Sequence, residues 1–259
     1  MHNQILMVAI LATTGCVGEV HRGNGVEATE ARTVGSFSEV SANGPFDVAV
    51  STGAPTVEVT CDENLLPDIT TEVQGDTLVI GTREEDGTWI LLAPEAPCHV
   101  RVSTPTLRGV GATGSGWLIV RGEAPDLAEV HSTGSGGVLV EPVILASALR
   151  VTATGSGEIE LETIEVGAVE LEVVGSGRVA IGGGSADSLT AQITGSGDLD
   201  APALVVDRAD VTISGSGGAE LTVTGSLEAL LTGSGSLVIH GDPPERDVNT
   251  TGSGDVRFE

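Results

Sequence analysis

Four aspartates in the C-terminal half of the chain come closest to a catalytic arrangement. Asp198 and Asp200 stand two positions apart, and Asp207 and Asp210 follow within one short stretch. Carboxylates gathered on one face are the groups with which glycoside hydrolases break sugar chains, and acidic repetitive β-proteins include polysaccharide lyases and hydrolases. These four residues are therefore the candidate set for a carbohydrate-active enzyme.

The residues one repeat earlier favour a different interpretation of the same carboxylates. If the repeats described below stack in register, Arg178 lies beside Asp198 and Glu158 lies beside Arg178. Charges that alternate across adjacent strands form a solvated ladder, which needs no catalytic role. The chain also has no Tyr, three Phe and two Trp, so few rings are available to stack on sugars. We therefore expect no catalytic residue and keep the enzyme as the alternative.

Other motifs that carry chemistry do not occur in the sequence. No Gly-x-Ser-x-Gly hydrolase elbow is present, and no P-loop lysine follows a glycine run. The segment "GGGSADSL" (182–189) resembles one calcium-binding nonapeptide, but Ser185 occupies a glycine position and the motif does not recur. We expect no metal and no cofactor, because metal-ligand spacing is also absent from the five histidines His2, His21, His99, His131 and His240.

Composition limits the partners that this chain can have. The 259 residues include 11 Lys and Arg against 37 Asp and Glu, for a net charge of −26. Nucleic acid is excluded because phosphate binding needs a basic surface. Adsorption to anionic lipid is disfavoured for the same reason. Because 40% of the residues are hydrophobic, the chain can bury a core and is not expected to be disordered.

The N-terminus has the pattern of an export signal. Residues 5–16, "ILMVAILATTGC", are an apolar stretch, then small residues, then a cysteine, as in lipoprotein signal peptides. We predict a signal peptide over 1–15, lipidation of Cys16 and a flexible tether over 16–32. The alternative is a secretory signal with a chance cysteine, because no Lys or Arg precedes the apolar stretch and Thr13 stands where Leu is usual. Lipidation would place the protein in the cell envelope, on the outer membrane.

The C-terminal part of the chain repeats the tripeptide Gly-Ser-Gly every 18 to 21 residues. Apolar residues occur two and four positions after each unit, and another stands four positions before it. This period of two predicts a half-buried strand on each side of a bend. Glycine inside a strand costs about 0.5–1 kcal/mol, so the tripeptides belong at the bends. The units begin at Gly114, Gly134, Gly155, Gly175, Gly195, Gly215, Gly233 and Gly252.

A constant period of about 20 residues predicts a parallel β-solenoid, or β-helix, over residues 106–259. One coil cannot bury enough apolar surface to fold alone, whereas stacked coils share a continuous core. We expect "EIEL" (158–161), "RVAI" (178–181), "DLDA" (198–201) and "GAEL" (218–221) to pair in register. Antiparallel hairpins are the alternative, and the constant offset from strand to bend argues against them.

Residues 33–105 lack the tripeptide but also read as β-structure. "FDVAVST", "TVEVTC", "DTLVIGT" and "HVRVST" alternate in polarity, and turn-forming residues separate them. We interpret this section as irregular β-coils that are continuous with the regular stack. The section holds Cys61 and Cys98, which remain as a pair once Cys16 carries lipid. We predict a disulfide between them, because an exported chain folds in an oxidising compartment; two separately buried thiols are the alternative.

The whole pattern resembles a known family. Phe37 and Val40 open the first strand, "ENLLPDITTEV" follows Cys61, and Leu107 precedes the first Gly-Ser-Gly. These features resemble the bacterial GIN-domain proteins, described as auto-transporter adhesin heads, over about residues 35–258. The resemblance implies a right-handed β-solenoid without catalytic residues. The sequence thus predicts a non-catalytic envelope lipoprotein that binds an unidentified protein or glycan.

Overall fold

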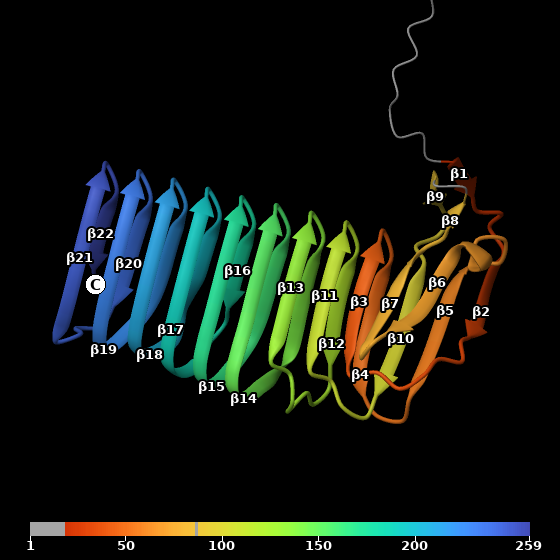
Figure 1. Ribbon diagram of the computed structural model, residues 1–259, viewed down its shortest axis with the longest axis horizontal. Coiled ribbons are helices and arrows are strands. Elements are labelled where there is room, and N and C mark those ends of the chain that lie inside the picture. Colours follow the sequence, from red (N-terminus) through yellow and green to blue (C-terminus); the bar gives the residue numbers. More distant parts are fainter. Residues whose placement is uncertain (1–18, 86–87) are drawn as a thin grey trace, which may run out of the picture.

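The computed structural model describes residues 19–85 and 88–259. The predicted signal peptide and the predicted lipidation site Cys16 lie outside these residues. The structure is 73% strand and forms a parallel β-solenoid of about seven turns (Figure 1), so the predicted fold class is confirmed. In the part of the chain that the structure describes, no helix is long and apolar enough to cross a membrane.

Every regular coil contributes a strand segment before its Gly-Ser-Gly and another after it. We call the two resulting surfaces the pre-corner sheet and the post-corner sheet. Pairing also continues around the opposite side of most coils, so several strands extend through both sheets. The regular strands are β11 (Gly109–Gly114), β12 (Trp117–Arg121), β13 (Glu129–Gly134), β14 (Gly137–Gly155), β15 (Glu158–Gly175), β16 (Arg178–Ile181), β17 (Gly184–Gly195), β18 (Asp198–Gly215), β19 (Gly218–Gly233), β20 (Ser236–His240), β21 (Glu245–Gly252) and β22 (Asp255–Phe258).

The predicted register of the stack is confirmed. Glu158 pairs with Arg178, Arg178 pairs with Asp198, and Asp198 pairs with Gly218, all in parallel. The unequal spacing of the tripeptides is absorbed away from the corners. The register shifts between Val140 and Val143 in β14, and again in β18 on the side opposite the tripeptides.

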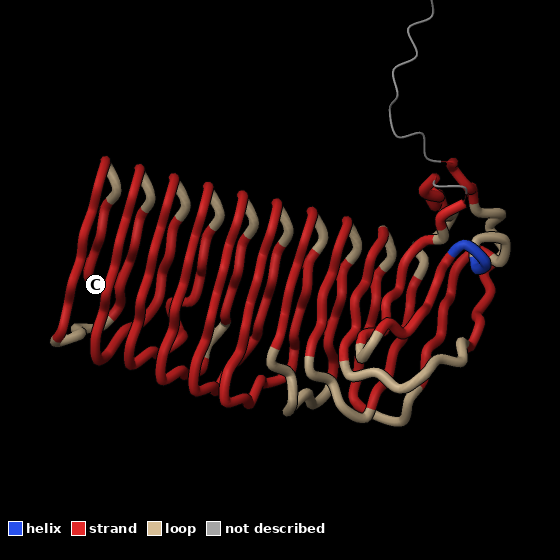
Figure 2. Tube along the Cα trace, viewed as in Figure 1, coloured by secondary structure: helices blue, strands red, loops and turns tan. Residues whose placement is uncertain are grey.

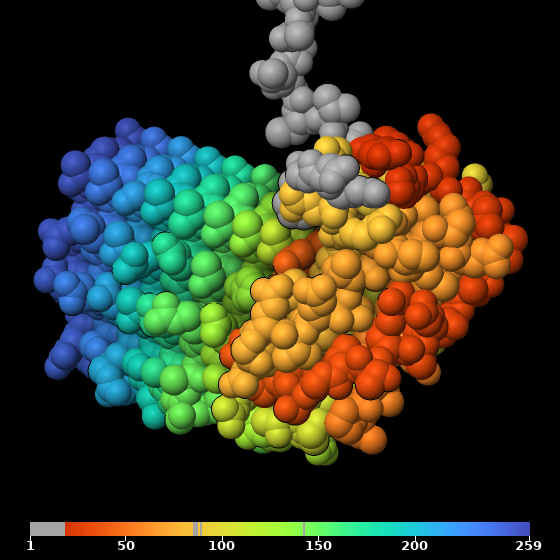
Figure 3. Space-filling model, turned by 45° about the vertical axis from the view of Figure 1, so that its right-hand side comes forward, coloured from red at the N-terminus to blue at the C-terminus, as the bar shows by residue number. Residues whose placement is uncertain are grey.

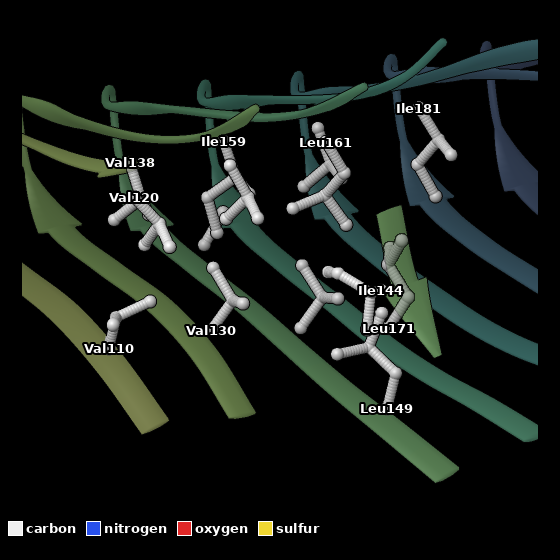
Figure 4. Packing of buried hydrophobic residues seen from close by; sticks show 14 of the residues in the cluster. Val110, Val120, Val130, Val138, Ile144, Leu149, Ile159, Leu161, Leu171 and Ile181 are labelled. Carbon is white, nitrogen blue, oxygen red and sulfur yellow. The ribbon is translucent and has the colours of Figure 1, made fainter. Parts of the chain in front are cut away.

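The core is a set of apolar columns between the two sheets. Val110, Val130 and Leu171 point inward from the pre-corner sheet, and Ile159 and Ile181 point inward from the post-corner sheet (Figure 4). Each of these side chains is at most 1% exposed. Because an inward residue stacks on its counterpart one coil away, the alternating polarity of the sequence becomes a dry interior that extends along the stack.

The section before β11 differs from the predicted coils. Its strands β3 and β4 do form a first coil, because they pair in parallel with β11 and β12. Beyond that coil, β5 is antiparallel to β10. Strand β6 is antiparallel to β7, because the two-residue turn between them can join only antiparallel strands. Figure 3 shows this section over the end of the stack. Its strands are β3 (Glu39–Gly44), β4 (Asp47–Thr52), β5 (Thr56–Asp62), β6 (Ile69–Gln74), β7 (Thr77–Thr82), β8 (Glu84–Glu85), β9 (Thr88–Ala93) and β10 (His99–Thr104).

The prediction of a flexible tether is wrong for residues 19–31. Strand β1 (Glu19–Arg22) pairs in parallel with β9, and β2 (Glu27–Ala31) pairs antiparallel with β5. These segments are polar because they are edge strands, which pair on one side only and whose side chains are mostly exposed to solvent. The 3-10 turn η1 (Leu66–Asp68) lies beside them and helps to close this end of the core.

Candidate functional site: corners and outer faces

The Gly-Ser-Gly corners carry two backbone ladders along the stack. The N–H of Ser196 donates to the carbonyl of Gly175 at 2.8 Å, and the N–H of Asp198 donates to the carbonyl of Gly177 at 3.1 Å. Equivalent bonds recur from coil to coil, so the turns form one row along an edge of the molecule (Figure 2). The serines whose N–H groups form the first ladder are Ser135, Ser156, Ser176, Ser196, Ser216, Ser234 and Ser253.

Both glycines of the tripeptide are required, for different reasons. The first has positive φ in every unit, between 102° at Gly155 and 130° at Gly215, a conformation that side chains disfavour. At the third position of the tripeptide a side chain is excluded by proximity alone, because a Cβ on Gly197 would lie 2.5 Å from the carbonyl oxygen of Gly177. The hydrogen bonds therefore bring successive turns too close for any side chain at these two positions.

The middle serines and the residues that precede the glycines are exposed along the same edge. Thr194 and Ser196 both face solvent. Val174 and Leu230 interrupt the row of polar groups near this edge and are 36% and 46% exposed. The edge is thus a hydroxyl-rich surface with apolar interruptions.

The predicted register places Glu158, Arg178 and Asp198 side by side on the post-corner sheet, but the ion pair of Arg178 is with Asp200 and not with Asp198. The Nη2 of Arg178 donates to Oδ2 of Asp200, and this hydrogen bond raises the pKa of Arg178. Asp198 accepts the N–H of Gly218 at 2.8 Å through its Oδ1. His240 approaches Glu220 at 2.7 Å in the same region. Arg178, Glu220 and the two aspartates line an open groove of about 290 Å³, and the partners described above are one another, His240 and the backbone.

The four candidate aspartates do not converge. Asp198 and Asp200 point outward from the post-corner sheet. Asp210 belongs to the pre-corner part of β18, where it pairs with Glu228 and lines a second open groove. Asp207 lies where the register of β18 shifts, and Arg208 donates to it at 3.1 Å. The carboxylates are therefore divided between two faces and a bend, so the four cannot act on one sugar linkage.

The two cysteines of the N-terminal section are bonded to each other. Cys61 is the penultimate residue of β5, Cys98 precedes β10, and their Cα atoms are 4.4 Å apart. Both are buried. The adjacent Asp62 is also buried and accepts N–H groups from Gly25 at 2.5 Å and Glu95 at 2.9 Å. The bridge and this carboxylate together attach the first residues of the described chain to the closed end of the stack.

A second buried carboxylate holds β1 in place. Asp68 is 3% exposed, and it contacts Nδ1 of His21 at 2.6 Å and Nη2 of Arg83 at 2.9 Å. The hydrogen bond to Asp68 raises the pKa of His21. No sequence pattern indicated this cluster, because its members come from three separate elements and have no regular spacing.

The segment that resembles a calcium motif is another close corner. Gly184 has a φ of 113°, and a Cβ there would lie 1.8 Å from the carbonyl oxygen of Ile164. Across residues 19–85 and 88–259, no group of three or more His, Cys, Asp or Glu side chains is arranged to hold a metal ion.

A family model with the description "Putative auto-transporter adhesin, head GIN domain" matches residues 36–243. The chain belongs to the GIN-domain family. The resemblance seen in the sequence is therefore confirmed, and the match runs from just before β3 to just after β20 of this GIN domain. No protein of curated function matches the sequence.

Solved structures share the fold of this GIN domain along almost its whole length. A protein of Parabacteroides distasonis, titled a putative lipid binding protein, is 25% identical with a TM-score of 0.84, and the alignment covers 93% of this chain and 100% of that one. A putative adhesin of Parabacteroides merdae is 22% identical with a TM-score of 0.82 and the same coverage. A putative adhesin of Bacteroides fragilis is 16% identical with a TM-score of 0.68, covering 92% of this chain and 100% of that one.

Proposed function

We propose that this GIN domain is a non-catalytic module of the bacterial cell envelope that binds a surface ligand through the outer faces of its solenoid. The observation that carries the proposal is the filled interior, in which the columns of buried side chains leave no room for a ligand. Binding must then use outward side chains. The dispersed aspartates argue against the alternative of a carbohydrate-active enzyme.

The titles of the similar structures agree with such a role. They are called adhesins or, in one case, a lipid binding protein. A lipid tail bound by this chain would have to lie against an outer face, and the outer faces carry many charges. An adhesion-like contact with a polar ligand fits these faces better.

Attachment to the envelope is the second part of the proposal. We infer that residues 1–15 are removed on export and that Cys16 then carries lipid on the outer membrane. Labelling cells with a radioactive fatty acid tests this point. We expect label in the wild-type chain and none in Cys16→Ser, which should be released as a soluble protein. No label in the wild-type chain, or equal labelling of both chains, would contradict lipidation of Cys16.

The binding role is tested with purified Cys16→Ser protein on a glycan array and on whole cells. We expect saturable binding without any change in ligand length over a long incubation. Shortening of a bound polysaccharide would favour the enzyme alternative. Failure to bind any glycan or cell surface would contradict the proposed function.

A further inference from the structure

The N-terminal half of the post-corner sheet carries a groove unlike the acidic ones. Its floor is Ala49 in β4, between two larger neighbours: Arg101 pairs with Ala49 from β10, and Ile119 pairs with it from β12. Arg121 and His99 complete the walls, and the groove encloses about 300 Å³. We call it the Ala49 groove.

Positive charge is concentrated at the Ala49 groove, although the chain as a whole is strongly acidic. All eleven basic residues are arginines, against 37 acidic ones, yet two of the eleven line this one groove. Arg101 is exposed and, among the described residues, has no carboxylate within ion-pair distance. Arg121 uses only its Nε, which contacts Glu141 at 3.3 Å, and its side chain is 59% exposed. Both guanidinium groups can therefore receive an anion.

An aromatic surface lies next to the groove. Trp117 follows the first Gly-Ser-Gly and pairs with Gly137, one coil further on. A Cβ at Gly137 would lie 2.6 Å from Cζ3 and 2.7 Å from Cη2 of Trp117, so the ring lies over this glycine. Gly137 is buried although its register position faces outward, because the ring covers it.

The carboxylates at the groove are few and partly engaged. Asp47 accepts the N–H of Trp117 at 3.0 Å. Glu58 pairs in register with Arg101 across β5 and β10 and lines the adjoining groove, which shares Ala49, Arg101 and Arg121, and Glu141 contacts Nε of Arg121. A ligand carboxylate would be repelled by Glu58 but could meet the guanidinium groups from the opposite side of the groove.

We propose that the Ala49 groove binds a carboxylated saccharide, such as a stretch of polyuronate, and this inference rests on the proposed surface-binding function. Arg101 and Arg121 stand two strands apart, about 10 Å, and each can hold a carboxylate in a two-bond fork. The Trp117 ring offers an apolar face for a pyranose. An acidic peptide fits less well: β10, β4 and β12 are each paired on both sides, so no free strand edge can take up its backbone.

Trp117 provides a direct readout of binding. The chain has only two tryptophans, so Trp89→Phe leaves Trp117 as the sole emitter. In exported protein that also carries Cys16→Ser, we expect trigalacturonate to change the fluorescence saturably and neutral maltotriose to leave it unchanged. No change with trigalacturonate would overturn the proposal.

Calorimetry then locates the site. Arg101→Gln and Arg121→Gln should each weaken trigalacturonate binding about tenfold, the value of one charge-assisted contact. Arg178→Gln is the matched control, because Arg178 is exposed on the same sheet three coils away, and it should change affinity less than about twofold. Equal effects at all three arginines would overturn the assignment. Hexaglutamate that binds as tightly as trigalacturonate, with the same dependence on Arg101, would also overturn it.

Two results separate this inference from the proposed function. If the chain binds cells or array glycans but not trigalacturonate, the ligand class is wrong and the surface-binding role stands. If it binds none of them, both are wrong.

Trp117→Ala should lose trigalacturonate binding while its circular dichroism and melting temperature stay unchanged. If that variant does not fold, the exposed arginine variants decide whether the groove is the site.

Discussion

Substituting the corner glycines one at a time separates the two physical reasons for the tripeptide. In the unit at 195–197, Gly195 has a φ of 114°, and a Cβ there would lie 2.4 Å from the carbonyl oxygen of Gly175. Gly197 has no positive φ, but its Cβ would meet the carbonyl oxygen of Gly177 at 2.5 Å. Ser196 is exposed, and its ladder bond uses only its backbone N–H.

The expected magnitudes follow from these contacts. Gly195→Ala combines a strained backbone, about 1–3 kcal/mol, with a close contact of about 1–3 kcal/mol, so it should lower the free energy of unfolding by about 2–6 kcal/mol. Gly197→Ala has only the contact and should lower it by about 1–3 kcal/mol. Ser196→Ala keeps the ladder and should stay within about 0.5 kcal/mol.

Urea denaturation followed by circular dichroism measures the three differences from the transition midpoints. At a position where Ala fits, Gly→Ala stabilises the protein by about 0.4–1 kcal/mol because the unfolded chain loses conformational freedom. Even the sign of the change in the free energy of unfolding is therefore informative. The order Gly195, then Gly197, then Ser196 is the expected result. Stabilisation by either glycine substitution would refute the explanation of the corner.

Two further predictions concern the closed N-terminal end. Cys61→Ala with Cys98→Ala opens a bridge across a sequence separation of 37 and should lower the free energy of unfolding by about 4 kcal/mol; two alkylatable thiols in the unreduced wild-type protein would contradict the bond. The contact between His21 and Asp68 should make β1 sensitive to pH. The raised pKa of His21 means that folding favours the protonated imidazole, so the contribution of this contact to stability is complete below about 6.5, the ordinary pKa of histidine, and is lost as pH rises through the higher pKa of the folded state. Glu19 adds to this effect and Arg83 opposes it. Amide hydrogen exchange of β1, corrected for intrinsic rates, should accelerate over that range relative to the rest of the chain, and His21→Gln should remove the difference; equal pH dependence in both proteins would refute it.

The regular stack could be predicted because its sequence signal repeats. Each Gly-Ser-Gly marks a corner of the regular stack, and the alternating apolar residues around it assign inward and outward positions. The opposite side of the coil could not be placed this way, because its residues vary from coil to coil and the register shifts there, as between Ala201 and Val205. Only "GGG" at 182–184 has a comparable signal, and Gly184 forms another close corner.

The closed N-terminal end could be predicted only in part. The polarity of "TVEVTC" and "HVRVST" identified β5 and β10, but pairing partners depend on which strands meet in space. The strands β1 and β2 were missed because edge strands have polar sequences that resemble a tether. Trp117 left one faint trace in the sequence, since a third glycine, Gly137, directly follows the next tripeptide and makes room for the ring.

The division of roles among the corner, inward and outward positions of each coil explains why the fold alone cannot identify the ligand. Stability requires glycines at two corner positions and apolar residues at the inward ones, so the outward positions can vary without affecting the stack. Structures only 16% to 25% identical to this chain keep the fold with TM-scores of 0.68 to 0.84, as this division predicts. In this chain the outward positions are used unevenly: carboxylates occupy the coils around Asp198 and Asp210, whereas Arg101, Arg121 and Trp117 lie together nearer the closed end. Binding specificity in such a solenoid should therefore depend on the outward residues of a few adjacent coils. The register between coils shows which outward residues lie side by side, and these are the ones to compare between family members.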